Sequence, residues 1–236
     1  MADPQSVEIF NSWDLYGNIV RNNWMRHEQM AKFIQSASAG LDLRVLDLGC
    51  GDGAMARNGL LGRRIEKYVG IDLSQDALDH LKRASGLGID PQVILGDIRE
   101  SVEKLPSKSF NLVLASYSLH HFQSQDKQRI LGQIARVLMP QGRFLWIDIA
   151  CLEGEDRSGY IHRIQDEIQN CWVPMPKQHC EDAIEHICNH DFPERESWMI
   201  QAWEEVCKIQ TTWNQATADK PQIGYRDRFY IALSLA

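Results

Sequence analysis

Between residues 41 and 150, short apolar runs alternate with helical patterns, and this alternation limits the fold more than any other feature. The runs are LRVLDLG, KYVGIDL, PQVILGD, FNLVLAS and GRFLWIDIA, all rich in Val, Ile, Leu and Phe. The periodicity between them predicts helices at about 76–84 and 126–138, with Ser74 as an N-cap. Strands that alternate with helices are typical of a parallel sheet covered on both faces.

Helical patterns also flank this core. In the N-terminal 40 residues, spacings of three and four predict one amphipathic helix (Trp13, Tyr16, Val20, Trp24, His27, Ala31 and Ile34). After residue 150, three helical patterns cover about 156–172, 180–190 and 193–207, which is too long a connection for a simple crossover. The runs KIQTTWN and YRDRFYIALSL alternate enough to be two antiparallel strands joined by a loop at 215–224.

Charge and cysteine usage limit the classes of partner. The chain has 236 residues, a net charge of -7 and no Lys/Arg run, which argues against a nucleic acid partner. The six cysteines form no C-x-x-C pair, and the first residues lack the regions of a signal peptide. No apolar run approaches the roughly 20 residues that cross a bilayer. We therefore expect a cytoplasmic protein with no membrane partner.

The sequence VLDLGCGDGA ends the first apolar run in a turn with three glycines in five positions. A dinucleotide fingerprint is spaced G-x-G-x-x-G and brings a pyrophosphate onto backbone N–H groups, but here the third glycine comes one residue early. Asp47 and Asp52 bracket the turn. Like charges about 4 Å apart repel by roughly 4 kcal/mol at an effective dielectric constant near 20. A phosphate-free cation such as S-adenosylmethionine therefore fits better than a pyrophosphate.

At these residues the chain resembles the class I S-adenosylmethionine-dependent methyltransferases of the small-molecule type. The turn is similar to their first motif, and VGIDLS, LGDI and FNLVLASYSLHHF resemble the next three. The resemblance implies S-adenosylmethionine as cofactor, with Asp47 near its ammonium group, Asp72 on the ribose and Asp97 on the adenine amine. The implied cofactor residues are Asp47, Gly49, Cys50, Gly51, Asp52, Gly53, Asp72, Leu73, Asp97, Ile98, Ala115 and Ser116.

The resemblance also implies the architecture of the whole chain. We expect an α/β fold with a Rossmann-like, mostly parallel seven-stranded sheet, an antiparallel last strand and helices on both faces. The expected single domain consists of an N-terminal helical cap (1–40), a cofactor-binding core (41–150), a helical substrate lid (151–207) and closing strands (208–236).

Methyl transfer from a sulfonium is an in-line displacement, and the positive charge already activates the methyl donor. The main task of the protein is therefore to position the acceptor in line with the methyl group. Orientation can supply about 7–11 kcal/mol, whereas a general base contributes about 3–5 kcal/mol. In SLHHF, His121 and His120 are candidates for a base, and the preceding Tyr117 could orient an acceptor. Each of the three could instead pack beside the cofactor. The candidates for acceptor binding are Tyr16, Trp24, Asp148, Arg157, Tyr160 and Trp172.

The segment HCEDAIEHICNH gathers His179, Cys180, His186, Cys188 and His190, but its cysteines lack the paired spacing of zinc ligands, so we expect no metal. The predicted function is methyl transfer to an oxygen or nitrogen atom of a small metabolite. Two alternatives stay open, a methyltransferase that acts on a protein or RNA and a non-catalytic module that binds S-adenosylmethionine.

Overall fold

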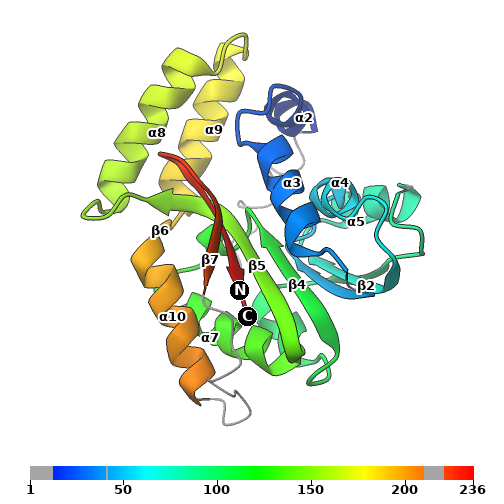
Figure 1. Cartoon of the computed structure of the whole chain (residues 1–236). Helices are drawn as coiled ribbons and strands as arrows, with labels where there is room; N and C mark the ends of the chain where they lie inside the picture. The colour runs from blue at the N-terminus through cyan, green and yellow to red at the C-terminus, as the bar shows by residue number, and fades with distance from the viewer. Residues whose placement is uncertain (1–12, 41, 85, 210–220) are drawn as a thin grey trace.

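The computed structural model describes residues 13–40, 42–84, 86–209 and 221–236 (Figure 1). Strands and helices alternate through the core as the apolar runs predict. In chain order they are β1 (Leu43–Leu48), α4 (Ala54–Gly59), β2 (Ile65–Asp72), α5 (Gln75–Arg83), β3 (Gln92–Leu95), α6 (Ile98–Glu103), β4 (Phe110–Ser116), α7 (Ser124–Val137) and β5 (Leu138–Cys151). Ser74 caps α5, because its side chain accepts a hydrogen bond from Ala77 N.

The strands of the main sheet have the order β3-β2-β1-β4-β5-β8-β7. Strands β1 to β5 are parallel, whereas β8 (Tyr230–Leu235) runs antiparallel to both β5 and β7 (Gln222–Arg226). A two-residue strand, β6 (Glu194–Arg195), pairs with the end of β5. This arrangement confirms the predicted fold class. Its register places Leu48 beside both Ile71 and Ala115, so β1, β2 and β4 end at one edge.

Apolar side chains fill a layer on each face of the sheet. On one face, Ile34, Leu78 and Ile164 of α3 (His27–Ala37), α5 and α8 (Arg157–Cys171) belong to a single buried cluster. On the other face, the buried cluster includes Ile134 of α7 and Trp203 of α10 (Glu196–Ile209). Figure 1 shows α7 and α10 on one side of the sheet and α3 to α5 on the other. None of the described helices is long and apolar enough to span a membrane.

The prediction of a single N-terminal helix is wrong. The structure has two helices, α2 (Trp13–Arg21) and α3, separated by a turn in which Asn23 and Arg26 adopt φ angles of 53° and 60°. The Arg26 guanidinium donates to Asp227 Oδ2 at 2.9 Å, which anchors the turn to the C-terminal hairpin. The apolar spacing continues through the turn, so periodicity alone did not reveal the break.

The prediction of a closing strand at KIQTTWN is also wrong for the two residues of this run that the structure describes. Lys208 and Ile209 belong to α10, and residues 210–214 lie outside the described residues. Both strands of the hairpin instead come from residues 222–235, so the expected loop at 215–224 contains the start of β7. Asp227 forms the turn, because its Oδ1 accepts hydrogen bonds from the backbone N–H groups of Phe229 (2.8 Å) and Tyr230 (2.9 Å).

Close packing of α3 on α4 at Gly59 gives a test of this arrangement. A Cβ atom at Gly59 would lie 2.6 Å from Ile34 Cβ, an atom attached directly to the helix backbone, whereas a Cβ at Gly132 in α7 would meet nothing within 4 Å. We expect Gly59→Ala to lower the free energy of unfolding by about 1–3 kcal/mol, because overpacking strains the contact. Gly132→Ala is the control and should raise it by about 0.5–1 kcal/mol. Urea denaturation measures both, and a Gly59→Ala variant as stable as the natural chain would contradict this packing.

Candidate active site

A cavity of about 720 Å³ opens at the edge where β1, β2 and β4 end. The glycine turn after β1 forms one part of its wall, and Tyr16 of α2 and His27 of α3 form another. The helix pair α8 and α9 (Lys177–His190), which Figure 1 shows beyond the end of the sheet, supplies further wall residues including Tyr160 and Ile187. Helix α10, expected as part of the lid, packs on the far face of the sheet, and none of its described side chains lines the cavity.

The glycine turn presents backbone to this cavity. Gly49 and Gly51 adopt φ angles of 68° and 52°, which residues with a Cβ rarely tolerate. Gly49 N and Cys50 N donate to Ile71 O at 2.8 and 3.0 Å, so the turn is tied to the end of β2. A Cβ at Gly49 would lie 2.4 Å from the Ser118 Cβ, so glycine is required here for space as well as for conformation.

Three carboxylates, those of Asp47, Asp52 and Asp72, line the same part of the cavity. Asp47 is only 3% exposed, and burial raises its pKa to about 7 although the Tyr68 hydroxyl donates to it at 2.6 Å. Burial also raises the pKa of Asp72, whose two oxygens accept hydrogen bonds from Gly51 N (2.8 Å) and Ser74 N (2.9 Å). Among the described residues, no lysine lines the cavity, and the lining arginine, Arg99, is paired with Asp97 and Asp126. The electrostatics therefore favour a cation over a phosphate.

Beyond Asp72 the wall is apolar. Leu73 lines the cavity and is 39% exposed, and Ile98 lies on the same wall. Asp97 is not a lining residue, since it caps α6 and binds the Arg99 guanidinium, with 2.6 Å between Nη2 and Oδ2. Burial opposes ionisation of Asp97, but the hydrogen bonds from Arg99 outweigh it and hold its pKa below the usual value.

Of the other expected cofactor residues, Ser116 lines the cavity and has a buried hydroxyl oxygen without a hydrogen-bond partner among the described residues. Besides Asp97, two expected cofactor residues are outside the lining. Gly53 is the N-cap of α4, where a Cβ would lie 2.5 Å from Leu81, and Ala115 is fully buried within the sheet. The strand position of Ala115 was predicted correctly, but its side chain points into the core.

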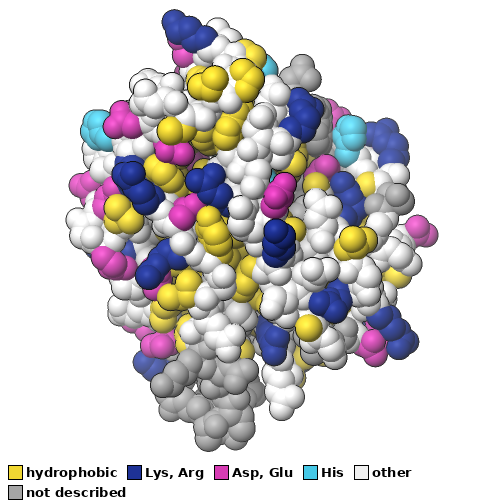
Figure 2. All heavy atoms as spheres, turned by 45° about the horizontal axis from the view of Figure 1, so that its top comes forward, with side chains coloured by type: hydrophobic (Ala, Val, Ile, Leu, Met, Phe, Trp, Pro, Cys, Tyr) yellow, Lys and Arg dark blue, Asp and Glu magenta, His cyan; other side chains and the backbone are white. Residues whose placement is uncertain are grey.

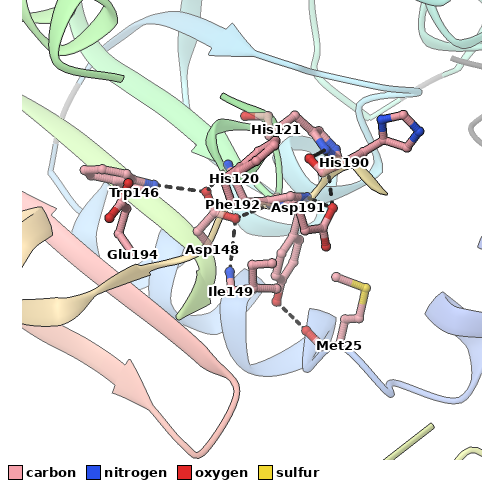
Figure 3. A network of polar contacts seen from close by, with 12 residues as sticks. Met25, His120, His121, Trp146, Asp148, Ile149, His190, Asp191, Phe192 and Glu194 are labelled. Atoms are coloured by element: carbon pink, nitrogen blue, oxygen red, sulfur yellow. Dashed lines mark hydrogen bonds and ion pairs between the residues drawn. The ribbon is translucent and has the colours of Figure 1, made fainter. Parts of the chain in front are cut away.

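The three candidates for catalysis follow β4 and all line the cavity. Tyr117 has a φ angle of 54°, and its hydroxyl donates to Met25 O, so this side chain fixes the turn between α2 and α3. The next turn is a short 3-10 helix, Leu119–His121, which carries both histidines. Figure 3 shows His120 and His121 side by side above Asp148 and Asp191.

His120 is held by Asp148. The Nδ1 atom of His120 forms a hydrogen bond with Asp148 Oδ1, while His120 N and Trp146 Nε1 both donate to Asp148 Oδ2 at 3.1 Å (Figure 3). Burial opposes a charge on His120, but Asp148 and Asp191 outweigh it and raise its pKa. Burial lowers the pKa of His121 well below the usual value, and the neighbouring His120 and His186 add to this effect. His121 is therefore neutral at physiological pH and has a nitrogen lone pair.

Asp191, which the sequence analysis did not identify, completes this group. Its Oδ1 lies 3.6 Å from His120 Nε2, 3.5 Å from His121 Nδ1 and 3.8 Å from His186 Nε2. Burial raises its pKa to about 6. The residue follows HCEDAIEHICNH directly and is 70 positions from His121, so only the fold brings the two together. Further lining residues that the sequence analysis missed are Met25, His27, Gly96, Arg99, Ser118, Ile149, Ile164, Ile187, Asn189 and Tyr230.

The expected acceptor residues divide into two groups. Tyr16, Tyr160 and Trp172 line the cavity. The other expected residues (Trp24, Asp148 and Arg157) do not line it. Trp24 stacks on Trp172 with 5.3 Å between ring centroids. Asp148 is buried against His120, and Arg157 donates to the backbone oxygens of Asp191 (2.6 Å) and Cys188 (2.5 Å), so neither side chain faces an acceptor.

The raised pKa of Asp47 gives a pH test. Because folding raises this pKa from 3.8 to about 7, the folded chain holds the proton more tightly than the unfolded chain. The contribution of Asp47 to stability is therefore greatest below about pH 4 and declines as the pH rises to about 7. Relative to the natural chain, Asp47→Asn should become more stable by about 3 kcal/mol between pH 5 and pH 8. Urea denaturation at both pH values measures this change, and an equal stability difference at pH 5 and pH 8 would rule out the buried, protonated carboxyl.

Comparison with known proteins relates part of this chain to a family. Residues 45–142 match the family model described as a methyltransferase domain. An uncharacterized methyltransferase of Schizosaccharomyces pombe is 37% identical over 103 residues, which are 43% of this chain and 38% of that protein. The fatty-acid O-methyltransferase of Mycolicibacterium smegmatis is 33% identical over 105 residues, which are 44% of this chain and 36% of that protein.

The likeness in fold extends over nearly the whole chain. The crystal structure of the plantazolicin methyltransferase BpumL, in complex with a triazolic desmethylPZN analog and SAH, aligns with a TM-score of 0.64. The alignment covers 98% of this chain and 93% of that chain at 14% sequence identity. The chain spans less than half the length of the two curated relatives. The residues matched by the family model include the glycine turn, Asp72 and the histidine pair. Residues 45–142 therefore match a methyltransferase domain, and the described fold is the Rossmann-like fold of class I methyltransferases.

Proposed function

We propose that this chain transfers a methyl group from S-adenosylmethionine to an oxygen or nitrogen atom of a small molecule. The observation that carries the proposal is the continuity of one cavity of about 720 Å³ from the acidic glycine turn to the apolar side chains of α8 and α9. Sites for small ligands typically have volumes of about 300–1,000 Å³. The cavity therefore has room for the cofactor together with a small acceptor.

The cofactor end of the cavity fits S-adenosylmethionine in charge and shape. Asp72 is held by two backbone donors and presents its carboxylate to the ribose. Burial raises the pKa of Asp47 to about 7, and a nearby ammonium group would favour the ionised form of this carboxyl and pair with it. Leu73 and Ile98 offer an apolar surface for the adenine ring. The buried hydroxyl of Ser116 provides a hydrogen-bonding group at the end of β4. Asp97 acts indirectly, by capping α6 beneath this surface.

The acceptor end is apolar and aromatic. It is formed by residues of β5, of α8 and its C-cap, of α9 and of β8, which are Ile149, Tyr160, Ile164, Trp172, Ala183, Ile187 and Tyr230. When bound, S-adenosylmethionine supplies a methyl group activated by the sulfonium charge, so the protein has to orient the acceptor and exclude water. Tyr117 and Tyr160 shape the site, and His120 and His121 are the polar groups that meet the reactive atom of the acceptor.

Two further observations support a small, largely apolar acceptor. The fatty-acid O-methyltransferase is named for an apolar small molecule. Charges of both signs are interspersed on the face shown in Figure 2, which does not favour nucleic acid as a partner. The six cysteines are free thiols, in keeping with a reaction in the cytoplasm.

Binding of the cofactor is tested at Asp72. We expect Asp72→Asn to weaken the affinity for S-adenosylmethionine at least tenfold, because a charged hydrogen bond to the ribose is worth about 1.5–3 kcal/mol. The control is Asp76→Asn, which removes the same charge from an exposed position in the first turn of α5. Isothermal titration calorimetry measures both affinities. Equal affinities of Asp72→Asn and Asp76→Asn would overturn the assignment of the ribose site.

Methyl transfer itself is tested with methyl-labelled S-adenosylmethionine and a cell extract separated into small-molecule, protein and nucleic-acid fractions. We expect label in the small-molecule fraction and its loss with Asp72→Asn. Label in a macromolecular fraction would instead identify a protein or RNA methyltransferase. Tight binding of the cofactor without transfer to any fraction would point to a non-catalytic module.

A further inference from the structure

We propose that His120, His121 and Asp191 form a binding site for a first-row divalent transition-metal ion in the wall of the cavity. The sequence-based prediction of no metal was made from residues 179–190 alone. The site proposed here instead combines two histidines of the turn after β4 with the residue that follows α9. One ligand atom from each of the three residues lies within 4.8 Å of the other two. Imidazole nitrogen with one carboxylate oxygen is a common ligand set for such ions.

The distances suit a metal ion better than direct hydrogen bonds. Asp191 Oδ1 lies 3.6 Å from His120 Nε2 and 3.5 Å from His121 Nδ1. Two donors that each bind one ion at about 2.1 Å in tetrahedral geometry are about 3.4 Å apart. His186 Nε2 lies 3.8 Å from the same oxygen and is placed to serve as a fourth ligand. Small side-chain movements would therefore complete the coordination.

The hydrogen bonding around His120 orients it as a ligand. Its Nδ1 is bound to Asp148 Oδ1, so in the neutral ring the lone pair is on Nε2, the nitrogen that faces Asp191. Asp148 is in turn fixed by Trp146 Nε1 and Ile149 N, and Figure 3 shows it at the centre of this network. Metal-binding histidines commonly donate their other ring N–H to a carboxylate in this way, which fixes the ring and strengthens it as a ligand.

Hydrogen bonds to the backbone fix the position of Asp191 and leave its carboxylate available to bind a metal ion. Arg157 Nε donates to Asp191 O at 2.6 Å, and Phe192 N donates to His120 O at 2.7 Å. Lys127, the nearby buried cation, is bound to Phe192 O and to Glu194. The Oδ1 atom of Asp191 is buried and has no hydrogen-bond partner among the described residues. A buried carboxylate is costly unless it is paired or binds a metal, and an ion shared with the histidines would compensate it.

The position of the site suggests what the ion does. All three ligands line the cavity shared with the proposed acceptor site, so an ion there can accept a lone pair from an acceptor oxygen or nitrogen. A bound metal ion lowers the pKa of a hydroxyl that it coordinates, which would make an acceptor hydroxyl more nucleophilic. This role rests on the proposed methyl transfer, but binding of the ion does not, so the two proposals can fail separately.

The test is calorimetric titration of the chelator-treated full chain with Zn²⁺, and with Co²⁺ followed by its visible absorption. We expect one ion per chain with a dissociation constant in the micromolar range or below. Asp191→Asn and His121→Gln should each weaken binding at least tenfold and change the Co²⁺ spectrum. The control is His162→Gln, an exposed histidine on α8, which should bind like the natural chain.

Other outcomes would overturn the proposal. The absence of stoichiometric binding of Zn²⁺ and Co²⁺ would mean that His120, His121 and Asp191 do not form a metal site. Binding that is lost in Cys188→Ser but kept in Asp191→Asn would place the ion at the cysteines of α9. Circular dichroism checks that each variant is folded, and affinity for S-adenosylhomocysteine, measured in parallel, tests the cofactor site independently.

Discussion

The hydrogen bond from Gly51 N to Asp72 Oδ2 joins the glycine turn after β1 to the end of β2, and the proposed cofactor end of the cavity depends on it. The same carboxylate accepts from Ser74 N and so also fixes the start of α5. Both oxygens of Asp72 are therefore oriented before any ligand binds. Such preorganisation lowers the entropy cost of binding, because the turn does not have to be ordered by the ligand.

The other end of the cavity depends on contacts between segments that are distant in the sequence. Phe192 N donates to His120 O, and Arg157 of α8 donates to Asp191 O, so the lid helices are bonded to the turn after β4. The Arg26–Asp227 pair fixes the N-terminal turn against the C-terminal hairpin in the same way. The proposed acceptor site is thus shaped by elements from both ends of the chain around a core of local βα units.

The features that could be predicted from the sequence are those formed by residues close together in the chain. The strand order in the chain, the glycine turn, Asp47, Asp72 and the histidine pair follow from short patterns, since each strand and the turn after it are contiguous. The break between α2 and α3 was missed because Arg26 is held by Asp227, which is 201 residues away. Arg157 was expected to meet an acceptor, but the fold directs its guanidinium to backbone oxygens. Asp191 carries no motif, and only the tertiary structure brings it to the histidines.

A crystal structure of the full chain with S-adenosylhomocysteine would locate the cofactor site. We expect the ligand to occupy the cavity at the ends of β1, β2 and β4, with the ribose hydroxyls on Asp72 and the adenine ring against Leu73 and Ile98. A ligand bound at another surface, or one turned so that its ribose lies away from Asp72, would contradict the proposed binding of S-adenosylmethionine.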